Sequence, residues 1–150
     1  MIGFDQHSPH HAYDLITHTA YVVENTPPEL PLRWAALLHD IGKVPTFTQD
    51  ENGRGHFYGH AGESAAFAER ILQKLKAPTA LREEAVTLIG LHMTKLEPDK
   101  KVLRRWLSRL GRPLLDKLLL LQKADTVSKG RDVTAELRQF EMIHTILAEI

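Results

Sequence analysis

The sequence predicts an all-α protein of about seven helices, and two observations lead to this prediction. Apolar residues recur at helical spacing along most of the 150-residue chain. Several of these periodic segments begin near a proline or end near a glycine, and these are the positions that the two residues favour at helix boundaries. Because a chain of this length supports one core more readily than two, we expect residues 1–150 to form a single compact domain.

Each predicted helix has its own boundary signals. The first lies between His11 and Glu24, before a Pro-Pro pair that stops it, and the second begins at Pro31 and is closed by Gly42. The other five are expected over His60–Leu75, Pro78–His92, Asp99–Gly111 with Asp99 as the cap, Pro113 to near Gly130, and Val133 to the C-terminus.

The helical period is lost between residues 44 and 59. Asn52-Gly53, near the centre of this segment, is a strong signal for a tight turn. A hairpin that pairs residues 46–48 with 56–58 is compatible with the pattern but is too short to found a sheet. We therefore expect a loop or small hairpin that leans over a neighbouring part of the bundle.

Composition limits the classes of function. Lys+Arg and Asp+Glu both total 19, so no overall charge attracts the chain to nucleic acid or membrane. The chain has no cysteine, which excludes disulfides and thiolate ligands. The longest apolar run, Leu118–Leu121, is too short to cross a bilayer, and the polar start is unlike a signal peptide. We expect a soluble, cytoplasmic protein.

His39 and Asp40 are consecutive at the end of an apolar helix, where their side chains can converge. Taken alone, the pair is more typical of ordinary helix-end polarity than of a site. However, His18 borders a core-facing stripe and Asp125 lies in the most apolar helix, where an unpaired buried carboxylate costs several kcal/mol. A divalent ion bound by two imidazoles and two carboxylates would satisfy all four groups.

The segment Ala35–Lys43, with the sequence AALLHDIGK, resembles the signature of the HD-domain metal-dependent phosphohydrolases. That family is an all-α bundle whose metal ligands follow the order His, His-Asp, Asp. His18, His39, Asp40 and Asp125 match these positions in order. The resemblance implies a compact HD-domain bundle with a divalent metal centre.

The resemblance to the HD-domain family spans residues 11 to about 130. Some segments in this range, and one that precedes it, resemble a particular branch of the family more specifically. Gly3–Gln6, Tyr13-Asp14 with His18-Thr19, and Gly55–His60 are similar to the HD domain of bacterial tRNA nucleotidyltransferases, the CCA-adding enzymes. Their catalytic head, with a Gly-Ser followed by an Asp-x-Asp pair, is not in this sequence. We therefore expect no nucleotide addition by this chain, which is either a stand-alone relative or a fragment of a larger enzyme.

The family resemblance also implies roles for His60 and His92. Many members with two metals carry two further histidines between the His-Asp pair and the last Asp. Solvated histidines at helix ends are the alternative, since histidine is favourable at a helix C-terminus. We expect one or two ions, with His60 and His92 binding the second ion or the substrate. Imidazole and carboxylate ligands do not distinguish Mn, Fe, Co, Ni, Zn and Mg.

Asp40 and Lys43 are the candidate catalytic residues. A divalent ion lowers the pKa of bound water and polarises a phosphoryl oxygen, and Asp40 could orient or deprotonate that water while it binds the metal. Lys43, one turn further on, is the candidate phosphate-binding cation, with a solvated helix-end lysine as the alternative. Arg54 and His56 are candidate substrate contacts, although a hairpin tip without function is the default for Arg54.

The leading hypothesis is hydrolysis of a phosphomonoester or 2′,3′-cyclic phosphodiester of a small nucleotide-like substrate. One alternative is a di-iron oxygenase, because a few HD-fold proteins with the extended histidine set perform that chemistry. Another is a non-catalytic tRNA-binding module. The basic segment Lys95–Arg112, in which Lys101, Arg105 and Arg109 share a helical face, could contact RNA weakly, but a solvated helix is preferred. The oligomeric state is not determined by the sequence.

Overall fold

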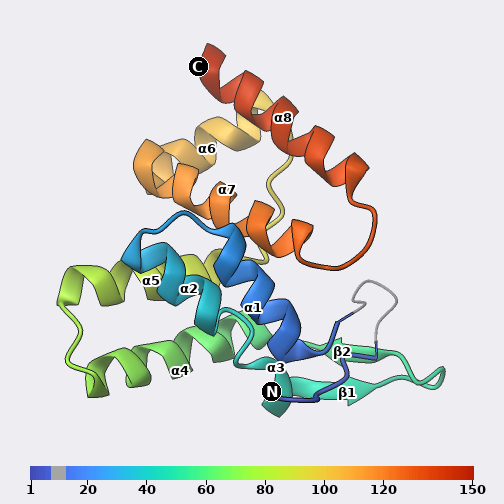
Figure 1. The fold of residues 1–150 in the computed structure, drawn as a ribbon. Helices are drawn as coiled ribbons and strands as arrows, with labels where there is room; N and C mark the ends of the chain where they lie inside the picture. The colour runs from blue at the N-terminus through green and yellow to red at the C-terminus, as the bar shows by residue number, and fades with distance from the viewer. Residues whose placement is uncertain (8–12) are drawn as a thin grey trace.

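A computed structural model describes residues 1–7 and 13–150, and it confirms the all-α class. Within these residues, seven helices of nine residues or more and one single-turn helix enclose the core (Figure 1). The helices are α1 (Leu15–Asn25), α2 (Leu30–Leu38), α3 (Lys43–Thr46), α4 (His60–Lys74), α5 (Thr79–Leu91), α6 (Lys100–Leu110), α7 (Arg112–Val127) and α8 (Thr134–Glu149).

The capping residues explain where two of these helices begin. Asp14 accepts a hydrogen bond from the backbone N–H of Thr17 at 2.8 Å, and α1 begins directly after it. Of the helix predicted from His11, residues 11 and 12 lie outside the described residues, and Tyr13 and Asp14 precede the first residue of α1. Asp99 accepts from the N–H of Val102 at 3.0 Å, which confirms it as the cap of α6.

The second helix ends three residues earlier than predicted. It was expected to include Ile41 and to be closed by Gly42, but α2 stops at Leu38. Beyond it the chain turns more tightly: the N–H of Ile41 donates to the carbonyl of Leu38, and that of Lys43 to the carbonyl of Asp40. These i→i+3 turns take His39 and Asp40 out of the regular α-helix. Their side chains are therefore no longer held apart by the angle between consecutive residues of an α-helix.

The segment between α3 and α4 contains the expected hairpin. Strands β1 (Phe47–Gln49) and β2 (Gly55–Phe57) are antiparallel, with Phe47 opposite Phe57. The register is the one expected for pairing 46–48 with 56–58, but both strands lie one residue closer to the turn. The N-terminal segment runs beside it: Gly55 donates its N–H to the carbonyl of His7, and the rings of Phe4 and Phe47 meet edge to face with centroids 5.2 Å apart.

One continuous core extends through the bundle. Buried residues from α1, α2, α4, α5, α6, α7 and α8 belong to it, including Leu32, Leu88, Leu118 and Ile143. The hairpin lies at one end of the molecule and α6 and α8 at the other, with α1, α2 and α7 between them (Figure 1). Among the described residues, no helix is long and apolar enough to cross a membrane.

Candidate metal centre

Six side chains that the sequence singled out meet at one place. They come from the ends or inner faces of α1, α4, α5 and α7 and from the turn after α2. Two groups share Asp40, and within each group the potential ligand atoms lie within 4.8 Å of one another. The groups are His18, His39, Asp40 and Asp125, and Asp40, His60 and His92.

In the first group, two imidazoles face two carboxylates. The Oδ2 atom of Asp40 lies 3.1 Å from Nε2 of His39 and 3.5 Å from Nε2 of His18. The Oδ1 atom of Asp125 lies 2.8 Å from Nε2 of His18 and 3.3 Å from Nε2 of His39. The His39 and Asp40 side chains therefore do converge, which the early end of α2 allows.

The second group uses the other oxygen of the same carboxylate. The Oδ1 atom of Asp40 lies 3.2 Å from Nε2 of His60 and 3.6 Å from Nε2 of His92, and these two nitrogens are 3.2 Å apart. His60 and His92 are buried, so neither is the solvated helix-end histidine of the alternative interpretation. Asp40 thus lies between two pairs of imidazoles, with one oxygen towards each pair.

Backbone carbonyls orient all four histidines in the same way. The Nδ1 atom of each ring lies at hydrogen-bonding distance from a carbonyl oxygen, and a carbonyl can only accept, so Nδ1 is the donor. This contact fixes the tautomer and directs Nε2 towards the carboxylates, as the outer contacts of metal-binding histidines do. The pairs are His18 with Ser128 at 2.8 Å, His39 with Ala36 at 2.6 Å, His60 with Phe57 at 3.1 Å, and His92 with Ile89 at 2.6 Å.

The bonding state of the central atoms fits a bound cation. Among the described residues, Nε2 of His39 and Oδ2 of Asp40 are buried and form no hydrogen bond, although they are only 3.1 Å apart. Leaving such atoms unsatisfied is costly, and both types are ligands for divalent metals. The buried His/Asp group therefore suits a divalent metal ion without identifying the element.

The electrostatics of the group agree with this reading. Burial by itself would lower the pKa of His39, but the adjacent carboxylates of Asp40 and Asp125 raise it to about 10. Burial would raise the pKa of Asp40, yet His39 and Lys43 hold it well below its usual range. For Asp125, burial would likewise raise the pKa, but the hydrogen bond from His18 and the adjacent imidazole of His39 hold it well below its usual range. Both carboxylates are ionised at neutral pH and attract a cation.

A close backbone contact places His60 beside Asp40. The N–H of Gly42 donates to Oγ of Ser64 at 2.8 Å. A Cβ atom on Gly42 would lie 2.6 Å from the backbone nitrogen of Ser64 and 2.7 Å from the carbonyl oxygen of His60. The first turn of α4 can approach the turn after α2 this closely only because residue 42 has no side chain.

Lys43 is buried beside the carboxylates, unlike the solvated helix-end lysine that was the alternative. Its Nζ atom donates to Oε1 of Gln6 at 2.5 Å and lies 3.4 Å from Oδ2 of Asp40. It also lies 4.9 Å from the centre of the Phe57 ring, within the range of a cation–π contact. These contacts fix a positive charge next to Asp40.

A cavity of about 240 Å³ lies over the metal centre. His56 lines it and is also paired with Asp50, with Nε2 and Oδ2 3.0 Å apart. Arg54 is exposed in the turn of the hairpin and does not line the cavity, so its contact with substrate stays a prediction. The full lining is Asp40, Lys43, Gly55, His56, Phe57, Tyr58, His60, Met93, Asp125 and Lys129.

Several residues around the centre were missed in the sequence. Gln6 is buried against Lys43, and Ser64 anchors Gly42 one turn after His60. Lys129 follows α7 and borders the cavity beside Asp125. The position of Lys129 one turn after Asp125 could have indicated that it lies near the metal centre. Gln6 was noted only as part of the Gly3–Gln6 likeness, and no periodic pattern around it indicated its contact with Lys43.

The basic segment forms an exposed face on α6. Lys101, Arg105 and Arg109 are all exposed, as their shared helical spacing predicts. Arg109 stacks on Trp106, with its guanidinium carbon 4.9 Å from the ring centre. Among the described residues, Lys101, Arg105 and Arg109 form no ion pair with an acidic side chain, so the face keeps its positive charge.

Comparison with known proteins agrees with this geometry. Residues 11–130 match the family model of the HD domain. The chain is similar to an A-adding tRNA nucleotidyltransferase of Deinococcus radiodurans, with 41% identity over 113 residues, which are 75% of this chain and 26% of that protein. It is also similar to a CC-adding tRNA nucleotidyltransferase of Thermus thermophilus, with 35% identity over 85% of this chain and 30% of that protein.

A third similarity is to a multifunctional CCA protein of Azoarcus sp., with 38% identity over 61% of this chain and 23% of that protein. The chain therefore spans less than a third of the length of each of these three curated relatives.

Proposed function

We propose that this chain, which belongs to the HD domain family, hydrolyses a phosphate ester with the help of two divalent metal ions. The single observation that carries the proposal is the position of Asp40, whose two carboxylate oxygens face separate pairs of imidazoles beneath a cavity. One ion would be held by His18, His39, Asp40 and Asp125. The other would be held by Asp40, His60 and His92.

The protein groups around the cavity suit phosphoryl transfer to water. When bound, divalent ions lower the pKa of a coordinated water and polarise phosphoryl oxygens. Lys43 is fixed beside Asp40 and can receive negative charge that develops on a phosphoryl oxygen. Asp40 is ionised and can accept a hydrogen bond from the attacking water, which orients it. Phe57, at the end of β2, and Tyr58, directly after it, line the cavity over the centre.

The proposed substrate is a phosphomonoester or a 2′,3′-cyclic phosphodiester of a nucleotide. In the cyclic case water adds to phosphorus, one P–O(ribose) bond breaks, and the leaving ribose oxygen takes a proton. The relatives support a nucleotide or RNA end as substrate, because two of them are named tRNA nucleotidyltransferases. The exposed basic face of α6 would supply a weak RNA contact.

The proposal is tested with protein that is stripped by chelation and reloaded separately with Mn, Fe, Co, Ni, Zn or Mg. Release of nitrophenol from bis-p-nitrophenyl phosphate and hydrolysis of 2′,3′-cyclic nucleotides are then measured. We expect activity with at least one metal, and a loss of about 100-fold or more in Asp125→Ala, which removes an ion ligand. Asp116→Ala is the matched control, since Asp116 is an exposed carboxylate on the same helix.

Three outcomes would contradict the proposal. Full activity in Asp125→Ala would show that the metal centre is not the site of hydrolysis. Oxygen consumption by the iron-loaded protein, without phosphate-ester hydrolysis under any metal, would favour the di-iron oxygenase. If neither activity is found and tRNA affinity is the same in Asp125→Ala, the chain is a binding module.

A further inference from the structure

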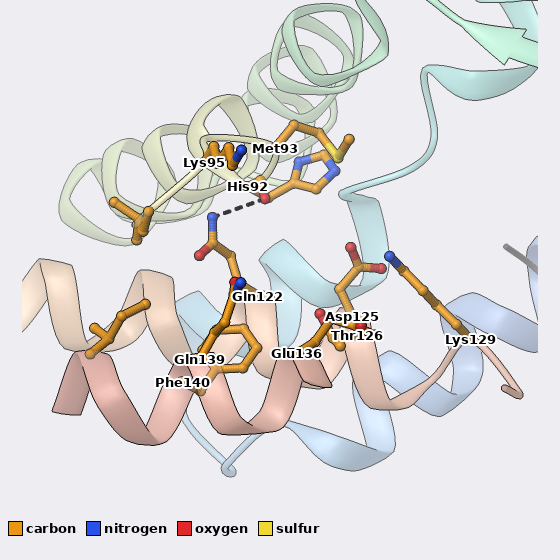
Figure 2. Close-up of a pocket in the computed structure, with 12 residues that line it drawn as sticks. His92, Met93, Lys95, Gln122, Asp125, Thr126, Lys129, Glu136, Gln139 and Phe140 are labelled. Carbon is orange, nitrogen blue, oxygen red and sulfur yellow. Dashed lines mark hydrogen bonds between the residues drawn. The ribbon is translucent and has the colours of Figure 1, made fainter. Parts of the chain in front are cut away.

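A second cavity of about 210 Å³ adjoins the metal centre on the side of α8 (Figure 2). It shares His92 and Asp125 with the metal centre, and Met93, Asp125 and Lys129 with the cavity described above. Together the two cavities fall within the range of about 300–1,000 Å³ that is typical of small-molecule sites. A ligand whose phosphate lies at the metal centre would therefore have a neighbouring space for the rest of the molecule.

Gln122 gives this second cavity a fixed hydrogen-bond acceptor. Its Nε2 atom donates to the carbonyls of His92 at 3.2 Å and Thr94 at 2.7 Å, and Figure 2 shows the first of these contacts. Both carbonyls can only accept, so the amide cannot flip without losing both bonds. Within the described residues, nothing donates to Oε1 of Gln122, so this oxygen is held in one orientation with its acceptor capacity unused.

An aromatic ring, apolar side chains and the polar side chains of Lys95, Thr126, Glu136 and Gln139 complete the walls. Phe140 on α8 and Gln122 on α7 both line the cavity and are labelled in Figure 2, and Met93, Leu96 and Ile143 line it as well. Lys129 and Asp125 lie at the other end, on the side of the metal centre. A planar heterocycle can stack on such a ring, and stacking of this kind is a major source of affinity for bases.

We propose that this second cavity binds the nucleobase of the substrate and prefers a base with an exocyclic amino group, such as cytosine or adenine. The inference rests on the proposed phosphohydrolase function and names its substrate class. The cytosine amino group donates a hydrogen bond, whereas the oxygen at the same position of uracil accepts one. Oε1 of Gln122 can only accept, so it would form a hydrogen bond with the amino group of cytosine. With uracil, two acceptor oxygens would face each other.

The first test compares ligands on the unchanged protein. Loaded with the metal that gives the highest activity on bis-p-nitrophenyl phosphate, the protein is assayed with 2′,3′-cyclic CMP and 2′,3′-cyclic UMP. We expect kcat/KM to be about tenfold higher for the cytidine compound, a factor equal to about 1.4 kcal/mol. In parallel, calorimetry measures binding of 3′-CMP and 3′-UMP, with the same direction of preference expected and no turnover required.

The second test changes the ring. Phe140→Leu keeps an apolar side chain but removes the stacking surface, and we expect KM for 2′,3′-cyclic CMP to rise about tenfold. Phe67→Leu is the matched control, since Phe67 is a partly buried aromatic residue on α4 that does not line either cavity. We expect its KM to equal that of the unchanged protein.

The outcomes separate the two proposals. Equal affinity and equal kcat/KM for cytidine and uridine compounds, with bis-p-nitrophenyl phosphate still hydrolysed, would overturn the base-binding cavity and leave the phosphohydrolase intact. Selective binding of 3′-CMP without hydrolysis of any ester would support the cavity and overturn the proposed reaction. An unchanged KM in Phe140→Leu would refute the assignment of the ring.

Discussion

The contact between Gly42 and the first turn of α4 is open to a direct test by Gly42→Ala. The backbone conformation at Gly42, with φ −78° and ψ −4°, is accessible to alanine, so the substitution introduces no strain in the main chain itself. The added methyl group would instead meet the nitrogen and Oγ of Ser64 and the carbonyl of His60, all closer than 3.0 Å. Two of these atoms belong to the backbone of α4, so relief requires movement of the helix.

The magnitude follows from two costs. Overpacking in a tightly packed interior costs about 1–3 kcal/mol. Weakening the hydrogen bond from Gly42 to Ser64 adds about 0.5–1.5 kcal/mol. We therefore expect the free energy of unfolding to fall by about 2–4 kcal/mol, which for a chain of this size lowers Tm by about 5–15 °C. Because His60 opens α4, the affinity for the second metal ion should fall as well.

The assay is thermal unfolding followed by circular dichroism, together with the metal content of the reloaded protein. Gly62→Ala, in the first turn of α4, is the control, since no atom lies within 4 Å of the added methyl group. Alanine at position 62 should stabilise α4 by about 0.5–1 kcal/mol relative to glycine. If Gly42→Ala melted at the same temperature as the unchanged protein and bound the same amount of metal, the role given to this close contact would be refuted.

Two further predictions concern charge. The pKa of His39 is raised from 6.5 to about 10, so the stability it contributes is complete below pH 6.5 and is lost as pH rises towards 10. Without metal, in the presence of a chelator, Tm should therefore fall as the pH rises from 6.5 towards 10. With saturating metal the fall should be smaller. A Tm that does not change with pH in chelator would contradict the pKa shift. Replacing Lys101 and Arg105 with Glu should weaken tRNA binding and reduce its salt dependence by up to two phosphate contacts, as measured by filter binding. An equal charge change at Lys74 and Lys76, at the end of α4, should have a smaller effect, and equal losses in both pairs would argue against a specific face on α6.

The sequence was most informative where local chemistry decides the structure. The cap at Asp99 and the exposed spacing of Lys101 and Arg105 follow from rules that act within one helix. The grouping of His18 with Asp125 was predictable for another reason, because polar side chains on apolar faces require partners.

Contacts between distant segments explain what the sequence did not reveal. The end of α2 was misplaced because Ile41 continues the apolar stripe, whereas the turn there is packed against Ser64, 22 residues beyond Gly42. The burial of Lys43 depends on Gln6 and Phe57, which lie in other elements. In the same way, the role of a polar residue such as Gln122 depends on which loop carbonyls meet its amide. Helical periodicity carries no information about such meetings.

The central claim is that Asp40 lies between two metal ions in the interior of the bundle. Crystals of the protein reloaded with manganese, measured for anomalous scattering, test it most directly, with elemental analysis of the same sample to count ions per chain. We predict two anomalous peaks, one beside His18, His39 and Asp125 and the other beside His60 and His92, both in contact with Asp40. A single peak away from Asp40, or no bound metal at saturating concentration, would contradict the claim.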